Sequence, residues 1–268
     1  MNKKEQIKNN WSIAALIKNS SISLTGEVIK KFFQGLSENL GKLILINLLW
    51  FFFAIPLFTL IFIKSVISST NFFVLFFSFL ILLAPATASV FNLTFQMIEG
   101  RNPKVVSEFF RGFRIYCKKG IVLSVITIAL FAIGFTDMWF YANLKPFNLL
   151  SVILVALGFL VVLLIGLMQN YLFPLMVQKN LSIKDNLLNS IYFTFDSIGF
   201  SFVIFLLSLA ILLILSLSGV GVPMLFMSLS SFLYNLAFRI LLVKKYGIEG
   251  EIAKIDAKSI YELYFKRR

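Results

Sequence analysis

The sequence contains no histidine and a single cysteine, Cys117. The absence of histidine excludes the common Ser-His-Asp triads and the zinc sites that depend on imidazole ligands. One cysteine can form neither an intramolecular disulfide nor a Cys/His metal cluster. Acidic residues are also few, since 12 Asp and Glu stand against 25 Lys and Arg, and no acidic pair lies inside an apolar block. We therefore expect a noncatalytic protein that binds no metal and no cofactor.

Charged residues as a whole are scarce, and apolar residues are abundant. They make up 14% and 59% of the chain, whereas about 25% of the residues of a soluble domain are charged. The apolar residues form uncharged blocks of about 20 residues or more, the length that a helix needs to cross a membrane. These blocks lack the alternating pattern of a barrel, so we expect an all-α, polytopic membrane protein. Six spans are predicted, at residues 43–63, 72–98, 121–141, 149–177, 198–218 and 222–243.

Lysine and arginine are distributed unevenly between the connecting segments. All but two of the 25, Lys64 and Lys145, lie in residues 1–42, in residues 101–119, around Lys179 or at the C-terminal end. Cytoplasmic segments of membrane proteins are enriched in basic residues, so both termini are expected in the cytoplasm. The same bias accounts for the net charge of +13 without a nucleic-acid partner, for which no motif is present.

The apolar blocks are spaced evenly, which predicts one membrane domain over residues 1–268. It comprises a cytoplasmic N-terminal segment (1–42), a six-span bundle (43–243) and a cytoplasmic C-terminal tail (244–268). The abundance of Asn, Lys, Ile and Phe is typical of AT-rich bacterial genomes. We therefore expect a bacterial plasma membrane protein, whose oligomeric state the sequence leaves open.

The chain contains an internal repeat. A shift of 77 residues aligns residues 28–42 (VIKKFFQGLSENLGK) with residues 105–119 (VVSEFFRGFRIYCKK), with Val, Phe, Phe, Gly and Lys identical. A shift of 78 residues aligns the segment from Arg101 with the segment from Lys179, with fewer matches. Each copy is expected to be an amphipathic helix on the cytoplasmic side, followed by two spans. Because Phe-rich segments also align by chance, the sequence leaves open whether the repeat is threefold.

The middle copy, residues 105–119, has the clearest amphipathic pattern. Apolar residues recur at spacings of three and four, and basic residues occupy the other side. Asn102 is placed to cap this helix and Pro103 to occupy its first turn, while Ser182 and Asp185 form a capping box in the third copy. Two interpretations compete: the helix rests on the headgroups of anionic lipids, or it docks onto a partner subunit. The candidate contact residues are Phe109, Arg111, Arg114 and Lys118.

A few polar side chains lie inside the predicted spans. Asn92 and Gln96 share one helix face near the end of the second span, and Asn170 lies in the fourth. These three residues could line a cavity in the membrane, as a transporter or channel for a small solute requires. Hydrogen bonding between helices is the alternative role for such residues. We favour this packing role and keep transport as the alternative function.

Three stretches resemble the YesL-like family of bacterial membrane proteins. They are NLLWFFFAIPLFT (47–59), APATAS (84–89) and EGRNPKVVSEFFRGFRIYCKKG (99–120), in that order. The resemblance implies no catalytic residues. It does imply a setting, because members of the family are associated with the uptake and breakdown of complex saccharides. We therefore expect an accessory subunit that supports binding-protein-dependent carbohydrate import, with sugar importer subunits as partners.

Overall fold

A computed structural model describes residues 21–66, 68–144 and 148–246, so Lys145 and the outer parts of both predicted terminal segments lie outside the described residues. Within these ranges the protein is helical and contains no strand. The helices are α2 (Ser21–Phe62), α3 (Ser69–Ile98), α4 (Val105–Ala142), α5 (Leu149–Lys179), α6 (Ile183–Asp196), α7 (Ile198–Leu217) and α8 (Gly221–Tyr246). All except α6 are long and apolar enough to cross a membrane. The chain is therefore an all-α, multi-pass membrane protein, as predicted.

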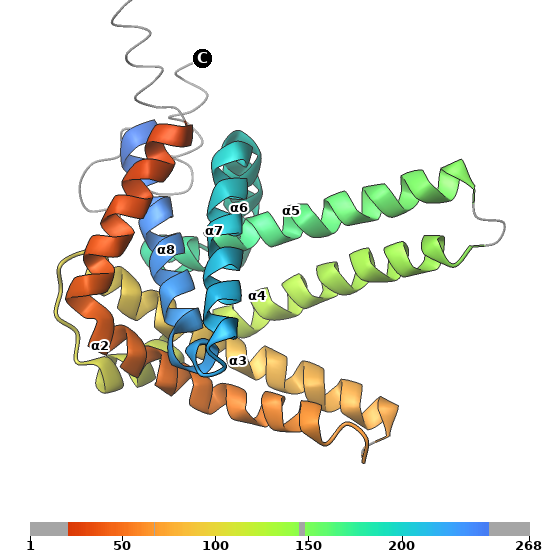
Figure 1. Cartoon of the computed structure of the whole chain (residues 1–268), viewed down its shortest axis with the longest axis horizontal. Helices are drawn as coiled ribbons and strands as arrows, with labels where there is room; N and C mark the ends of the chain where they lie inside the picture. The colour runs from red at the N-terminus through yellow and green to blue at the C-terminus, as the bar shows by residue number, and fades with distance from the viewer. Residues whose placement is uncertain (1–20, 67, 145–147, 247–268) are drawn as a thin grey trace, which may run out of the picture.

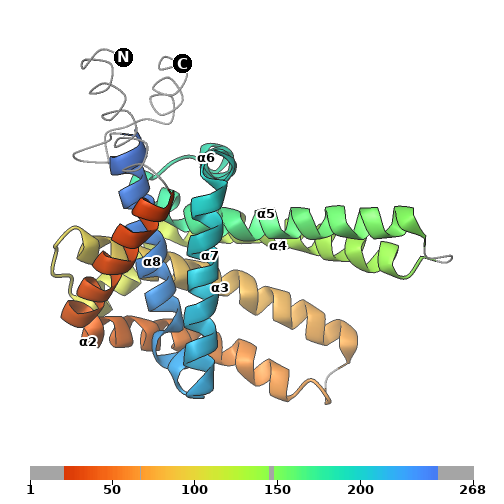
Figure 2. The ribbon, with the colours of Figure 1, turned by 45° about the horizontal axis from the view of Figure 1, so that its top comes forward.

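The six long helices form three hairpins, α2–α3, α4–α5 and α7–α8. Figures 1 and 2 show that the α2–α3 and α4–α5 hairpins project toward the same side with their tips spread apart, while α7–α8 points in another direction. Residues 21–42 of α2, residues 105–119 of α4 and all of α6 lie away from the α2–α3 and α4–α5 tips. We call these three segments the base. The final turns of α8 lie beside the start of α2 and complete this side of the molecule.

Each hairpin is preceded by its base segment, but only α6 is a separate helix. The expectation of short independent helices is wrong for the first two copies, because α2 and α4 continue without a break from the base into the membrane-spanning part. In the third copy the helix is interrupted at Ser197, which ends α6 and precedes α7. Lys245 of α8 holds this break by donating to the Asp196 carbonyl (2.7 Å) and the Ser197 hydroxyl (2.8 Å).

The three base segments pack in equivalent ways, each against the second helix of another hairpin. Gly35 of α2 faces the Phe232 ring of α8, where a Cβ would lie only 2.4 Å from the ring. Gly112 of α4 faces Ser89 of α3, where a Cβ would lie 3.3 Å from the Ser89 backbone. In α6, Asn186 donates to a carbonyl of α5 (3.1 Å). Since Gly35 and Gly112 are aligned by the 77-residue shift, the sequence repeat corresponds to a repeat in packing.

A shared pattern in α3, α5 and α8 extends the repeat to all three hairpins. Each of these helices carries an asparagine and, three positions later, a phenylalanine, and a basic residue follows the asparagine by nine positions, on the helix or just after its end. The three sets are Asn92, Phe95 and Arg101; Asn170, Phe173 and Lys179; and Asn235, Phe238 and Lys244. The third copy, which the sequence alignment left open, therefore has the same architecture as the other two.

The two predicted helix starts have different outcomes. Ser182 caps α6, since its hydroxyl accepts from the Asp185 backbone (3.2 Å) and donates to the Asp185 carboxylate (2.6 Å), which confirms the predicted helix start and the pairing of these two residues. The prediction for α4 is wrong. This helix begins at Val105 with Lys104 as its N-cap, so Asn102 and Pro103 precede the helix, and no side chain caps it.

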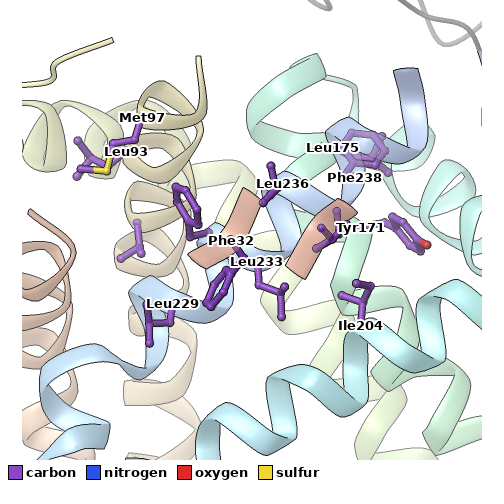
Figure 3. Close-up of a cluster of buried hydrophobic side chains, with 14 of the residues drawn as sticks. Phe32, Leu93, Met97, Tyr171, Leu175, Ile204, Leu229, Leu233, Leu236 and Phe238 are labelled. Atoms are coloured by element: carbon purple, nitrogen blue, oxygen red, sulfur yellow. The ribbon is translucent and has the colours of Figure 1, made fainter. Parts of the chain in front are cut away.

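The core is centred on α8. Figure 3 shows Phe32 of α2 beside Leu229, Leu233 and Leu236 of α8. On its other side, Phe238 of α8 packs edge-on against aromatic rings of α5 and α6. Thus α8 contacts helices of all three hairpins, and it holds the base segment of α2 directly.

Candidate functional site

Exposed residues of the α4 base segment form a mixed apolar and basic surface. Phe110 and Ile115 are 52% and 60% exposed, and Arg111, Arg114 and Lys118 are exposed beside them. These five residues lie along one side of the helix, because every pair is adjacent or separated by three, four, five, seven or eight positions. We call these five residues the α4 surface.

The charges of the α4 surface are only partly neutralised. Arg111 forms an ion pair with Glu108 in the preceding turn (3.2 Å). Within the described part of the chain, Arg114 and Lys118 form no ion pair. Exposed ion pairs stabilise by only about 0–1 kcal/mol, so Arg111 can leave Glu108 and bind a partner at little cost. The surface therefore offers two free cations, a third that is weakly held, and two large apolar side chains.

Phe109, the fourth predicted contact residue, does not belong to this surface. Its side chain is fully buried and stacks on Phe53 of α2, with the ring centroids 6.0 Å apart. Phe113 stacks on the same ring at 5.0 Å. The prediction of Phe109 as a contact residue is therefore corrected: it attaches the base segment to the bundle. Its neighbour Phe110 points outward instead.

The position of the α4 surface depends on small residues in α3. The run of small residues at 84–89 lies where α4 comes closest, since a Cβ at Gly112 would lie 3.3 Å from Ser89 and one at Gly120 would lie 3.5 Å from Ala84. Such small side chains allow two helix backbones to approach closely in a membrane. The indole of Trp50 in α2 donates to Thr87 in the same run (3.0 Å). This part of the sequence therefore positions α4 and contributes no chemistry itself.

The three predicted cavity-lining residues are not brought together. Asn92 packs beside Gly112, and Gln96 donates to Glu108 (3.3 Å), so both face α4. Asn170 is buried and donates to the Ser201 carbonyl of α7 (2.8 Å). Each of the three contacts a neighbouring helix, and two different helix pairs are involved.

Asn235 is one of the polar residues inside the predicted spans, and the sequence did not indicate that a polar cluster forms around it. Asn235 of α8 donates to the Phe91 carbonyl (2.8 Å) and the Thr94 hydroxyl (2.9 Å) of α3, and it accepts from Gln178 of α5 (2.9 Å). Asn47 of α2 similarly donates to a carbonyl of α8 (2.6 Å). Hydrogen bonding between helices is the role expected of polar residues inside spans, and the equivalent spacing of the asparagines in the three hairpins indicates it as well.

Several basic residues of the base donate hydrogen bonds to the C-terminal ends of helices. Arg239 of α8 donates to the Ile98 carbonyl at the end of α3 (3.0 Å). Lys119 donates to Asn180, the left-handed residue that ends α5 (2.7 Å). Cations are favourable at the negative ends of helix dipoles. Part of the excess positive charge is therefore structural, in contrast to Arg114 and Lys118.

Metal-binding groups are not clustered in the structure. Among the residues that the structure describes, no three His, Cys, Asp or Glu side chains lie close enough to hold a metal ion. Cys117 is a half-buried free thiol on the α4 base segment.

The comparisons with known proteins identify one related family. Residues 43–138 match the sequence model of a family described as a protein of unknown function, DUF624. This region contains the stretches 47–59, 84–89 and 99–120, but it covers less than half of the chain. No curated protein and no solved structure matches the chain. The YesL-like assignment and its link to saccharides therefore stay predictions.

Proposed function

We propose that this chain is a noncatalytic membrane subunit that supports carbohydrate import and acts through its α4 surface. The observation that carries this proposal is the contrast between the α4 surface and the membrane-spanning helices. Arg114 and Lys118 are exposed and free of ion pairs among the described residues, whereas Asn170 and Asn235 are engaged between helices. Groups that are available for binding therefore lie at the base.

The partner is a protein with an acidic, partly apolar surface. Arg114 and Lys118 would face its carboxylates, while Phe110 and Ile115 would supply apolar contact area, a combination typical of interfaces. In this proposal the base faces the cytoplasm of a bacterial cell, because the basic residues gather there. Subunits of a binding-protein-dependent sugar importer are the proposed partners, and this choice rests on the resemblance to the YesL-like family.

Transport of a small solute is the alternative. It needs a polar path through the bundle, and the predicted lining residues Asn92, Gln96 and Asn170 do not share one cavity. A cavity of about 300 Å³ does lie between α3, α4 and α5, but Leu, Ile, Phe and Ala side chains form most of its lining. This geometry favours the subunit over the transporter.

The test is copurification of importer subunits from the native bacterium in mild detergent. We expect the double variant Arg114→Glu, Lys118→Glu to lose these subunits and to slow growth on oligosaccharides. The matched control is Lys30→Glu, Lys184→Glu, which changes the charge of the base equally on exposed residues of α2 and α6 and should have no effect. Recovery of no importer subunit with the unchanged chain, or equal behaviour of both variants, would contradict the proposal.

A further inference from the structure

A second charged feature of the base is a cleft of about 270 Å³ between α2 and α8, closed at one side by the end of α3. Two turns of α2 and one face of α8 form its walls. The lining residues are Glu27, Lys31, Ile98, Leu236, Arg239, Ile240, Val243 and Lys244. On α8 the lining residues recur at spacings of three and four, and Arg239 and Lys244, five positions apart, reach the cleft from neighbouring parts of the helix surface. We call this feature the α2–α8 cleft.

Positive charge exceeds negative charge in the α2–α8 cleft. Lys31 and Lys244 both form ion pairs with Glu27, at 3.1 and 3.2 Å. Burial favours a higher pKa for Glu27, but the hydrogen bonds and charges of the two lysines outweigh this effect and lower its pKa below 4.5. Glu27 lies before the membrane-spanning part of α2. One ionised carboxylate is thus shared by two lysines, and Arg239 adds a third cation.

Arg239 retains unused donors. A guanidinium has five N–H groups, and within the described residues only one nitrogen of Arg239 forms a hydrogen bond, to the neutral Ile98 carbonyl. The side chain is half-buried and lines the cleft. A partly desolvated guanidinium that faces no carboxylate of its own is suited to an anionic ligand, which it can bind with two parallel hydrogen bonds.

The equivalent junction between α3 and α4 shows that this excess is not a general property of the repeat. There Arg101 pairs with Glu99 (2.8 Å) and Arg111 with Glu108 (3.2 Å), so these two arginines each have a carboxylate and none is shared. Gln96 replaces the arginine at the position equivalent to Arg239 and donates to Glu108. The charge of the α2–α8 cleft therefore needs an explanation specific to that site.

We propose that the α2–α8 cleft binds a phosphate group, with Arg239, Lys31 and Lys244 as its ligands. The cleft is large enough for a phosphate and part of the group that carries it. Its place in the base, beside the membrane-spanning helices, gives access to two sources of this chemistry: the headgroup of an anionic phospholipid and a soluble phosphate compound. The site is separate from the α4 surface, so either proposal can fail without the other.

The experiment compares neighbouring lysines in the purified full chain. Lys31→Gln removes a cation that lines the cleft, and Lys30→Gln is the matched control, because Lys30 is exposed and lies outside the cleft. One arm measures binding of inorganic phosphate and pyrophosphate in detergent by calorimetry. The other measures retention of phosphatidylglycerol against phosphatidylcholine by native mass spectrometry. Lys244→Gln serves as a second variant if Lys31→Gln does not fold.

We expect Lys31→Gln to weaken binding about tenfold, as the loss of one charge-assisted hydrogen bond predicts, and Lys30→Gln to leave it unchanged. A loss confined to the soluble probes identifies a soluble phosphate compound as the ligand. A loss confined to phosphatidylglycerol identifies a lipid headgroup. Absence of binding in both arms, or equal loss in Lys31→Gln and Lys30→Gln, would overturn the proposal.

Discussion

Helix α8 and the α4–α5 hairpin are both apolar, yet they have opposite surroundings. In the most apolar stretch of α8, 72% of the residues are buried inside the protein, against 11% in α4 and 22% in α5. Figure 1 shows the cause, because α8 lies among the other helices while the far half of the α4–α5 hairpin projects from the bundle.

The sequences of these helices follow their surroundings. The buried face of α8 carries polar residues, including Ser228, Ser231 and Asn235, which bond to neighbouring helices or within their own. The projecting part of α5 carries large apolar residues such as Leu157 and Leu160 on its exposed face. In lipid, a polar group must find a protein partner, whereas an apolar side chain is satisfied by lipid. Polarity therefore marks the centre of this protein.

The largest expected difference between the two regions is in packing. Leu233 of α8 is 2% exposed and Leu160 of α5 is 52% exposed. Leu233→Ala leaves a cavity that its neighbours cannot fill, so we expect the free energy of unfolding in mixed micelles to fall by about 2 kcal/mol. Leu160→Ala faces lipid and should change it by less than about 0.5 kcal/mol. Equal losses would mean that the hairpin is packed as tightly as α8.

The next difference concerns the two asparagines Asn235 and Asn143. Asn235→Leu removes three hydrogen bonds between helices, each worth about 0.6 kcal/mol in membranes, so we expect the free energy of unfolding to fall by about 1.8 kcal/mol. Asn143 is exposed at the end of α4 and bonds only within its own helix among the described residues. Thermal unfolding in detergent should show a lower midpoint for Asn235→Leu, whereas Asn143→Leu should leave the midpoint unchanged. An unchanged midpoint would argue against its central role.

The smallest difference concerns two tryptophans. Trp50→Phe removes the hydrogen bond to Thr87, and we expect a loss of about 0.6 kcal/mol. Trp139 is exposed on α4, so Trp139→Phe should have no measurable effect on unfolding. Denaturant unfolding of both variants and of the unchanged chain measures the two changes in the free energy of unfolding. A larger effect at Trp139 would contradict the exposed position of this end of the hairpin.

Much of the fold was predictable from the sequence, because its main signals are local. An uncharged block of sufficient length predicts a spanning helix, and the capping box at Ser182 and Asp185 predicts the start of α6. The packing role of Asn92, Gln96 and Asn170 was also the favoured interpretation, and all three contact neighbouring helices. These signals need only nearby residues.

The rest depends on contacts between distant parts of the chain. Phe109 and Phe110 are adjacent residues of one type, yet one is buried against Phe53 and the other is exposed. A wide apolar stripe does not reveal which of its edges faces protein and which faces lipid. Likewise, Arg239 reaches the end of α3 and lines one cleft with Glu27 only because α8 packs against both α2 and α3.

The proposed function requires the base to face the cytoplasm, and cysteine labelling tests this requirement most directly. In a Cys117→Ser background, Arg114→Cys places a thiol in the base and Asn143→Cys places one at the tip of the α4–α5 hairpin. A membrane-impermeant maleimide should label Asn143→Cys in intact spheroplasts and Arg114→Cys only after the membrane is permeabilised. Labelling of Arg114→Cys in intact spheroplasts, with Asn143→Cys protected, would contradict the account.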